Sequence, residues 1–481
     1  MGAGKPMPPV VPDLVAYVVE LEGSNDPMHP HNWAMRARVL YTALLTFCAL
    51  TTSYTSAVFA TTTQSVMKEF DFGHEVASLG TSLFVLGFAA GPIIWAPASE
   101  LTGRRWPLTI GTLGFSIFTI ADATCKDTQT LMLGRFFAGL FAASPITLVP
   151  ACLSDLFNAT HRGAAIALYT LAMFTGPYTA PFIGGYTVTS YLGWRWALYT
   201  PAIVGFFNTL MLVCFARESY APMVLVEKAR LLRRQTGNWA IHATHERLEI
   251  TIHDLITKTI ARPFHLLFTE PLAFLVTIYM SFIYGLAYGL LQAYPIVFQQ
   301  IHGMQGGNSG LPFIGLIIGQ MIATGVIMLL QRSYVAKLKA NNYVPVPEWR
   351  LPPCIAGGIA FSAGLFWFGW TGYTSSIHWM APTAASVFIG FGIISIFMQC
   401  FNYLLDCYLQ FAAAAFAANT IMRSLVGAAF PLFSTQLFNS LGVQWAGTLL
   451  GCIAALLVPI PFAFLYWGPT LRQRSRMAPA N

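Results

Sequence analysis

Two arginines lie inside long apolar stretches of this sequence, where a charge is costly. Arg135 lies in residues 131–153, and Arg423 lies in residues 411–436 with Asn419 one helical turn earlier on the same face. A guanidinium at the centre of a bilayer costs at least about 2.5 kcal/mol, so it normally faces a protein interior or a wet cavity and serves function. We therefore expect both side chains to point inward.

Each arginine also has a purely structural interpretation. Arg135 could extend to the membrane surface or bond to backbone carbonyls near the end of its helix. Arg423 could join two helices through hydrogen bonds to Asn402 or Asp406. For Arg423 this strut and a direct contact with substrate are equally good interpretations.

A charged loop follows a glycine-rich apolar stretch. Gly87 and Gly91 have the spacing that lets two helix backbones approach closely in a membrane. The loop after them carries Glu100, Gly103, Arg104 and Arg105. We expect a conformational latch, in which acid and guanidinium pair across two halves of the protein in one state and separate in another. The alternative is simple anchoring at the positively charged side of a membrane.

Polar and aromatic side chains within other apolar stretches are candidates for a substrate cavity. Tyr284 and Gln292 lie two turns apart on one face of a predicted helix and are slightly favoured, although any such residue is more often a packing residue. The full set of cavity candidates is Tyr54, Gln64, Tyr284, Gln292, Asn402, Asn419 and Arg423. Asp406, at the inner end of its stretch, is a candidate inner gate.

Acidic residues are expected only at the ends of the apolar stretches, as Glu100, Glu270 and Asp406 illustrate. A cavity for polyvalent cations needs buried carboxylates to balance the charge of its ligand. We therefore expect a neutral or anionic organic cargo in preference to polyamines.

The composition requires a bilayer as solvent. The 481 residues are 56% hydrophobic and 9% charged, whereas soluble domains carry about 25% charged residues. Twelve stretches are long enough to cross the roughly 30 Å of hydrocarbon as helices. They are residues 39–62, 77–98, 107–125, 131–153, 163–187, 195–216, 271–297, 310–331, 353–371, 379–405, 411–436 and 445–467. The predicted fold is an all-α integral membrane protein.

The stretches divide into two groups of six. The predicted segments are an N-terminal tail (1–38), a six-helix bundle (39–216), a linker with an amphipathic helix (217–268), a second six-helix bundle (269–467) and a basic tail (468–481). Gly87, Gly91 and Arg104 recur as Gly315, Gly319 and Arg332 at one offset of 228 residues. A duplicated six-helix unit leaves such an echo, and the second copy lacks the acid and one arginine.

Basic residues define the orientation. With the N-terminus in the cytoplasm, the inner segments hold 21 of the 26 Lys and Arg residues and the outer segments hold only Lys68, Lys126 and Arg195. Both termini are therefore expected on the cytoplasmic side. Asn158, although it begins a glycosylation tripeptide, then lies in a cytoplasmic loop and is expected to be unmodified.

Several function classes are disfavoured. The net charge of +7 is spread over short loops and forms no nucleic-acid patch. The eight cysteines have no paired spacing, so neither disulfides nor a metal site is expected. No glycine-rich phosphate loop is present. We expect no cofactor, no ATP-driven step and no enzyme activity.

The motifs together resemble the fungal drug:proton antiporter branch of the major facilitator superfamily, over residues 25 to about 470. The matching segments are residues 97–105 (Pro-x-Ser-Glu-x-x-Gly-Arg-Arg), 133–139, 176–185, 193–196, 218–222, 402–408 and 418–423. Two positions differ from that branch: Ala180-Pro181 replaces a second Gly-Pro, and Arg217 precedes Glu218 where proline is usual. The first difference weakens slightly the inference to obligate antiport.

The resemblance implies roles that the residues alone do not establish. It implies proton coupling for Arg135 with Gly139. It also implies an antiporter motif that limits leak through the unloaded carrier, formed by Gly176, Pro177, Pro181, Gly184 and Gly185. The alternative for this motif is a merely bent packing helix, because proline bends a helix and glycine permits close packing.

These observations predict a monomeric secondary carrier in the plasma membrane. Its two halves would rock about a central cavity and export a small organic molecule, such as a toxin, drug, secondary metabolite or organic acid, in exchange for protons. Two alternatives stay open. One is a facilitator or importer of a specific organic acid or nutrient, and the other is a membrane receptor or sensor without transport.

Overall fold

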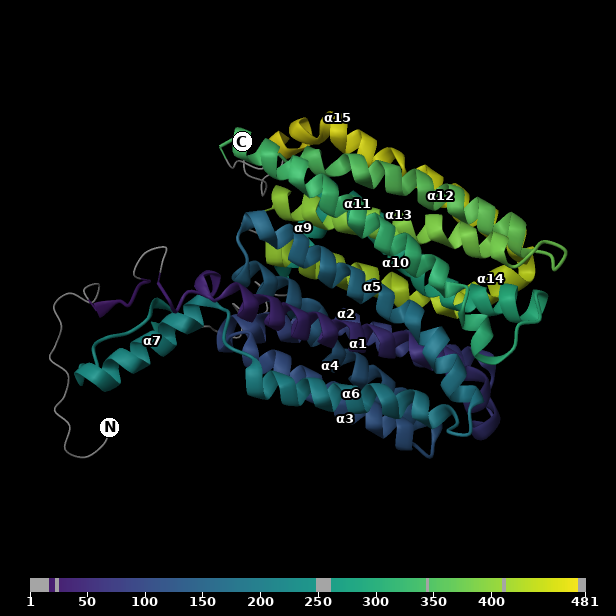
Figure 1. The fold of residues 1–481 in the computed structure, drawn as a ribbon, viewed down its shortest axis with the longest axis horizontal. Coiled ribbons are helices and arrows are strands. Elements are labelled where there is room, and N and C mark those ends of the chain that lie inside the picture. Colours follow the sequence, from purple (N-terminus) through teal and green to yellow (C-terminus); the bar gives the residue numbers. More distant parts are fainter. Residues whose placement is uncertain (1–16, 22–25, 248–260, 343–345, 409–411, 475–481) are drawn as a thin grey trace.

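The computed structural model describes the chain apart from residues 1–16, 22–25, 248–260, 343–345, 409–411 and 475–481. Parts of the predicted N-terminal tail, linker and basic C-terminal tail therefore lie outside the described residues. The described residues form one bundle of long helices that run nearly side by side (Figure 1). In a bilayer each backbone N–H and C=O must be satisfied within its own segment, which is why the apolar stretches are helical.

The first half contains six helices. They are α1 (Met35–Phe70), α2 (His74–Thr102), α3 (Arg105–Thr124), α4 (Thr128–Leu156), α5 (Ala159–Thr189) and α6 (Trp194–Phe215). Local signals end or begin several of them. Gly103 follows α2 with φ +85° and Gly193 precedes α6 with φ +77°, a region that favours glycine. The Asp127 side chain accepts a hydrogen bond from the Thr130 N–H at 2.7 Å and caps the N-terminus of α4.

The second half follows a linker with short helices. The linker contains α7 (Ala221–Thr236), η3 (Thr244–Arg247) and α9 (Arg262–Thr269). The second half contains α10 (Pro271–Tyr294), a π-helical turn η5 (Pro295–Ile301), η6 (Gly306–Gly310), α11 (Phe313–Ala340), η7 (Pro347–Arg350), α12 (Leu351–Gly372), α13 (Met380–Cys407), α14 (Ala412–Leu457) and α15 (Pro459–Arg474).

Gly442 divides α14, because its φ of 77° and ψ of 159° interrupt the helix. The two sides of this break correspond to the last two predicted spans, so each of the twelve stretches is mainly helical over its described residues. Within the described residues, nine helical segments are long and apolar enough to cross a membrane, and one of them, Ala414–Gln473, runs through the break. The helices α3 and α5 cover two further predicted spans without reaching that criterion.

Equivalent helix pairs, α2 with α4 in the first half and α11 with α13 in the second, pack closely through a glycine. In the first half a Cβ at Gly139 of α4 would overlap the backbone carbonyl of Phe84 in α2. In the second half a Cβ at Gly390 of α13 would overlap the carbonyl of Leu316 in α11. Small residues permit this backbone approach where lipid offers no hydrophobic drive for association. The same close approach therefore recurs in the two halves, at glycines that were not part of the sequence echo.

The halves meet along α5 with α11 and η6, and along α2 with α14. Four side-chain hydrogen bonds between the described residues join the two halves: Tyr186 to Asn308 (2.6 Å), Thr175 to Gln320 (3.1 Å), Gln436 to Glu75 (3.0 Å) and Ser56 with Tyr288 (2.8 Å). We call the end of the bundle with the α2–α3 turn and α7 the basic end, and the end with η6 the far end (Figure 1).

A small layer covers the basic end beside the first half. Val19 packs with Val226 and Ala229 of α7, and Val18 pairs with His242 as an isolated parallel bridge. The Asp26 carboxylate accepts from the buried Lys228 ammonium at 2.9 Å. The N-terminal segment and the linker therefore hold each other, a contact that the sequence patterns did not predict.

Candidate functional site

Two cavities lie between the halves. The cavity at the basic end has a volume of about 250 Å³ and is lined by α2, α4 and α5 of the first half and by α13 and α14 of the second. The cavity toward the far end measures about 530 Å³ and is lined by α1, α5, α10, η5 and η6. Both halves contribute to each cavity, which is the arrangement that a passage between them requires.

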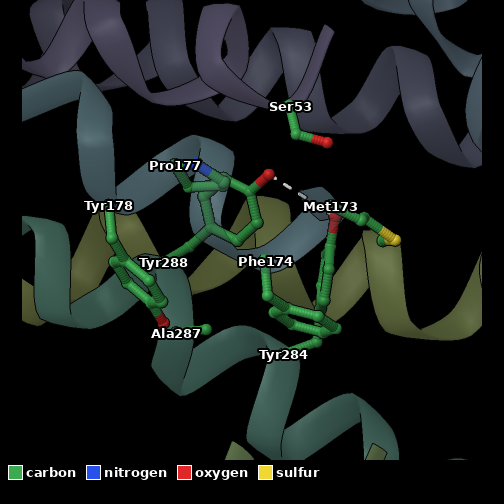
Figure 2. A pocket seen from close by; sticks show the side chains of 8 residues that line it. All are labelled: Ser53, Met173, Phe174, Pro177, Tyr178, Tyr284, Ala287 and Tyr288. Atoms are coloured by element: carbon green, nitrogen blue, oxygen red, sulfur yellow. Dashed lines mark hydrogen bonds between the residues drawn. The ribbon is translucent and has the colours of Figure 1, made fainter. Parts of the chain in front are cut away.

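An aromatic layer separates the two cavities. Phe174 of α5 meets Phe397 of α13 with ring centroids 4.6 Å apart, and Tyr284 and Tyr288 of α10 lie 5.1 Å apart. Only a void of about 10 Å³ remains among these side chains, and Figure 2 shows how the side chains from α5 and α10 converge on it. Tyr178 also lines this void. The layer leaves no room for a small organic molecule to pass in this conformation.

Arg423 lies where the basic-end cavity reaches the aromatic layer. Its side chain is almost fully buried, and its guanidinium lies over the rings of Tyr284 at 4.6 Å and Phe397 at 5.3 Å. Its Nε and Nη1 atoms donate no hydrogen bond to any described residue. The cavity therefore ends at a buried guanidinium with two nitrogens that have no hydrogen-bond partner among the described residues.

The alternative strut from Arg423 to Asp406 is not among the described hydrogen bonds. Asp406 accepts from the guanidinium of Arg350 at 3.2 Å and from the hydroxyl of Tyr334 at 3.2 Å. The strut to Asn402 is likewise absent among the described hydrogen bonds, although Asn402 is buried.

The remaining cavity candidates fall into different surroundings. Gln64 and Gln292 line the far-end cavity, whereas Tyr284 belongs to the aromatic layer. The favoured pair of Tyr284 and Gln292 therefore does not contact one ligand space. Asn419 points at α10, with its Nδ2 3.5 Å from the hydroxyl of Thr277. Neither Tyr54 nor Asn402 lines either cavity.

Arg135 is fully buried in the first half. Its Nε donates to the Gly80 carbonyl at 2.9 Å, and both terminal nitrogens approach the Thr55 carbonyl at 3.4 and 3.5 Å. The rings of Phe59 and Phe84 lie against the guanidinium at 4.9 and 4.4 Å. The side chain thus points inward as predicted, and it bonds to backbone carbonyls rather than reaching the membrane surface.

The sequence patterns did not single out one buried acid, which lies near the end of its apolar stretch. Asp122 of α3 is fully buried, and neither of its carboxylate oxygens has a hydrogen-bond partner among the described residues. A Cβ at Gly134 of α4 would overlap this carboxylate, so the glycine provides the space in which the side chain is enclosed. Because Asp122 lies near the end of its apolar stretch, only the packing of α4 over it decides that it is buried.

The glycines and prolines of the predicted antiporter motif lie at two interfaces of α5. Gly176 approaches the backbone of α1, where a Cβ would stand 2.9 Å from the Leu50 carbonyl and the Tyr54 nitrogen. Gly184 faces Thr61 and Val58 of α1, and Gly185 faces Gly307 of η6 in the second half. Pro177 lines the void in the aromatic layer, and Pro181 lines the far-end cavity. The motif therefore joins α1 to the boundary between the halves.

The charged loop is held within its own half in this conformation. The Arg104 guanidinium pairs with Asp155 of α4 at 3.3 Å and donates to the Ser99 hydroxyl at 2.6 Å. The Glu218 carboxylate accepts from the backbone N–H groups of Arg104 and Arg105 at 2.8 and 3.2 Å. Glu100 is exposed at the mouth of the basic-end cavity. No pairing across the halves by these residues is present among the described ion pairs.

The second half has a counterpart that sequence reasoning missed. Arg350 directly precedes α12 and pairs with Asp406 near the end of α13, as Arg104 directly precedes α3 and pairs with Asp155 near the end of α4. The echo at Arg332 suggested a degraded copy, because the acid and one arginine are missing there. Arg332 itself lies within α11 and does not directly precede α12. A second offset contained the signal: Gly139 to Gly390 and Asp155 to Asp406 are both separated by 251 residues.

Two six-helix halves with matching ion pairs, and cavities between the halves that end at an aromatic layer, define the class of multi-pass secondary carriers. The chain belongs to the Major Facilitator Superfamily, whose family model matches residues 42–431. Membership makes the chain a membrane transporter and not an enzyme.

Several fungal relatives match almost the whole chain. The Major facilitator superfamily multidrug transporter FLU1 of Candida albicans is 44% identical over 99% of this chain and 79% of its own length. The multidrug transporter TPO1_2 of Candida glabrata is 46% identical over 99% of this chain and 82% of its own length. An uncharacterized transporter of Schizosaccharomyces pombe, C36.03c, is 45% identical over 97% of this chain and 87% of its own length.

Solved structures share the fold at low sequence identity. The proton:xylose symporter XylE bound to 6-bromo-6-deoxy-D-glucose aligns with a TM-score of 0.64 and 16% identity, over 89% of this chain and 96% of the other. XylE from E. coli in a partially occluded inward open conformation aligns with a TM-score of 0.62 and 18% identity, over 89% of this chain and 99% of the other.

Proposed function

We propose that this transporter exports small organic molecules in exchange for protons by alternating access, with neutral or anionic cargo favoured over polyamines. The observation that carries the proposal is Arg423, a buried guanidinium with unused donors at the closed end of a cavity between the halves. Relatives named as multidrug transporters support the export of organic compounds.

The charge of the basic-end cavity supports the choice of cargo. Its acidic side chains, Glu100 and Asp155, lie with Arg104 and Arg162 near the α2–α3 and α4–α5 turns. Its deep end is formed by Arg423 with neutral groups such as Tyr169 and Phe397. An anionic or hydrogen-bonding cargo would satisfy the guanidinium, whereas a polyvalent cation would meet an uncompensated like charge. The buried Asp122 does not change this balance, because it lines neither cavity.

The orientation is part of the proposal. The excess of Lys and Arg at the basic end supports a cytoplasmic location for that end and for both termini. The basic-end cavity would then receive cargo from the cytoplasm, and opening of the aromatic layer would release it on the other side of a plasma membrane. The chain would work as a monomer, without ATP or a bound cofactor.

Arg135 supports the coupling to protons. It contacts the Thr55 carbonyl, and the adjacent Ser56 hydroxyl hydrogen-bonds to the Tyr288 hydroxyl of the second half at 2.8 Å. The hydroxyl of Tyr284 in turn lies 3.4 Å from that of Tyr288, a contact drawn in Figure 2. A shift in the position of Arg135, or a change in the protonation of its neighbour Asp122, would thus be transmitted through these contacts to the aromatic layer beside Arg423. We assign Arg135, with Gly139 providing the close α2–α4 approach, to coupling on this basis.

Flux in reconstituted vesicles tests the proposal. Vesicles with the basic end outside would be given benzoate, a neutral aromatic amide or spermidine, with and without an acidic lumen. We expect uptake of the carboxylate or the amide, stimulated by the proton gradient and abolished by a protonophore. Equal flux without a gradient would indicate a facilitator, and binding without flux would indicate a sensor; either result contradicts the proposal.

Variants of Arg423 test whether its guanidinium recognises the cargo. We expect Arg423→Gln to lower benzoate flux about tenfold or more while leaving flux of the neutral amide within about twofold, because a charge-assisted hydrogen bond contributes roughly 1.5–3 kcal/mol. Arg423→Lys should retain more of the benzoate flux than Arg423→Gln. Unchanged benzoate flux in Arg423→Gln, at equal protein per vesicle, would remove the guanidinium from cargo recognition.

A further inference from the structure

A third cavity lies outside the passage, between α7 and the start of α3. It has a volume of about 310 Å³. Its charged lining consists of three arginines and two glutamates, Arg105, Arg230, Arg234, Glu218 and Glu227. We propose that this cavity binds the headgroup of an anionic glycerophospholipid, through its phosphate, at the basic end of the carrier.

The basic residues of α7 divide into two sets. Lys228 pairs with Asp26 at 2.9 Å, and Arg233 pairs with Glu246 at 2.6 Å, so these cations are already matched inside the layer formed with the N-terminal segment. Arg230 and Arg234 are exposed and form no ion pair with any described residue. They lie four residues apart, on one face of the helix, and both line the cavity.

The glutamates only partly offset this positive charge. The Glu218 carboxylate accepts from the backbone N–H groups of Arg104, Arg105 and Tyr220, at 2.8 to 3.2 Å, so its oxygens are already engaged. With the exposed Glu227, the lining holds two carboxylates against three guanidinium groups, a formal charge of +1. Guanidinium groups bind phosphate oxygens through paired hydrogen bonds. The local charge therefore fits a phosphate monoanion or an anionic headgroup.

The surroundings favour a lipid over a soluble phosphate. Trp106 lines the cavity with 55% of its surface exposed, and the Arg105 guanidinium lies 5.4 Å from its ring. Arg105 also donates to the Val213 carbonyl at 3.0 Å, which places it beside the lipid-facing surface of α6, where Phe215 is 66% exposed. Acyl chains could follow this apolar surface while the phosphate lies among the arginines. Tryptophan at such a border is typical of the membrane–water interface.

The site would also act on the charged loop. Arg105 follows Arg104 directly, and Glu218 holds the backbone of both residues. A headgroup bound at Arg105 would therefore stabilise the loop that keeps Arg104 next to Asp155. The choice of an anionic lipid rests on the proposed cytoplasmic location of the basic end, because anionic lipids are concentrated in that leaflet.

Lipid binding to the purified full-length protein tests the inference. The protein in neutral detergent would be titrated with phosphatidylserine, phosphatidylcholine and soluble glycerophosphoserine, and binding would be followed by native mass spectrometry and by thermal unfolding. We expect saturable binding and a higher unfolding temperature with phosphatidylserine alone, weakened as ionic strength increases. Equal protection by glycerophosphoserine would overturn the lipid assignment, since it would identify a site for a free phosphate.

Paired variants make the test specific. We expect Arg230→Gln/Arg234→Gln to weaken phosphatidylserine binding about tenfold or more, since each arginine near a membrane surface contributes roughly 1 kcal/mol. Arg332→Gln/Lys339→Gln removes the same charge from exposed positions at the same end and should bind as the unaltered protein does. Equal losses in the two double variants would overturn the proposal. The readout is binding, so a failure of the proposed transport activity would not affect it.

Discussion

The two halves place an arginine–aspartate pair at the same point of their folds, but in different surroundings. Arg104 and Asp155 both line the basic-end cavity, and the aspartate side chain is 24% exposed. In the second half the Asp406 side chain is only 4% exposed, and its partner Arg350 lies over the Tyr334 ring at 3.6 Å and donates to Gln331 at 3.1 Å. The two arginine side chains are almost equally buried, at 11% and 10% exposed, so the difference lies in the aspartates. We call the first-half pair, with its partly exposed aspartate, the wet pair, and the second-half pair the sealed pair.

The different exposure of the two aspartates indicates two different roles for the two ion pairs. A pair that lines a water-accessible cavity can separate at low cost, because water replaces the partner of each ion. A sealed pair cannot, because a lone buried charge is strongly destabilising. We infer that the second-half pair holds α12 to α13 permanently, whereas the first-half pair is the one able to change between states.

The largest expected effect is at the sealed pair. Asp406→Asn leaves the Arg350 guanidinium without a counter-ion and should lower the free energy of unfolding by about 3 kcal/mol or more. Thermal unfolding in detergent, or recovery of monodisperse protein after heating, measures this loss. The double variant Asp406→Asn/Arg350→Gln should recover part of the stability. Wild-type stability in Asp406→Asn alone would remove the distinction between the pairs.

A backbone change in the first-half loop comes next. Gly103 has φ +85°, and a Cβ there would overlap the Glu218 carboxylate. Gly103→Ala should cost about 1–2 kcal/mol, since it combines an unfavourable backbone region with a displaced hydrogen-bond acceptor. Gly73→Ala is a matched control, because Gly73 lies in another loop of the same half with open space around it. Equal thermal stability of the two variants would show that Glu218 does not hold this loop.

The wet pair should affect conformation more than stability. Asp155→Asn should lower the unfolding free energy by only about 1 kcal/mol or less, because the pair is partly hydrated. It should, however, change how fast a maleimide labels a cysteine placed at Thr420, which lines the basic-end cavity, in a background without the native exposed Cys214 and Cys452. Labelling at the unaltered rate would contradict a role for this pair in the change between states.

The smallest change in stability is expected at Glu100. It is exposed, so Glu100→Gln should shift the unfolding free energy by no more than about 0.5 kcal/mol. As a latch residue it should nevertheless shift the Thr420→Cys labelling rate in the same assay. A variant with unchanged stability and unchanged labelling would reduce the loop to an anchor at the membrane surface.

Much of the fold could be predicted from composition and spacing. Twelve apolar stretches, the division at the linker and the echo from Gly87 to Gly315 follow from the one-dimensional pattern, because a bilayer accepts few other solutions. The inward direction of Arg135 and Arg423 was predictable for the same reason. The glycines at Gly139 and Gly176 could be singled out, although not the backbones that they approach.

The candidate site was predicted less completely. The aromatic layer of Phe174, Tyr288 and Phe397 was missed, since aromatic residues occur throughout the spans and none of these has a distinctive spacing. Asp122 was missed because it lies close to a loop, and Arg350 was missed because the echo pointed to Arg332. In each case the deciding contact comes from another helix, and for Asp122 and for Arg350, at the start of α12, that helix is the next one along the chain.

The sequence by itself determined that this protein lies in a bilayer, that its helices form two groups of six, and that Arg135 and Arg423 point inward. It could do so because the cost of exposing a polar group to lipid applies to each residue separately. Only the tertiary structure decided which charges are paired, which face a cavity and which are sealed. Those outcomes depend on the packing of α4 over α3 and of α13 beside α12, and the residues in such a contact come from segments with no common local pattern. Arg104 and Arg350 both precede a helix and both meet an aspartate, yet the first aspartate is partly exposed to a cavity and the second is enclosed.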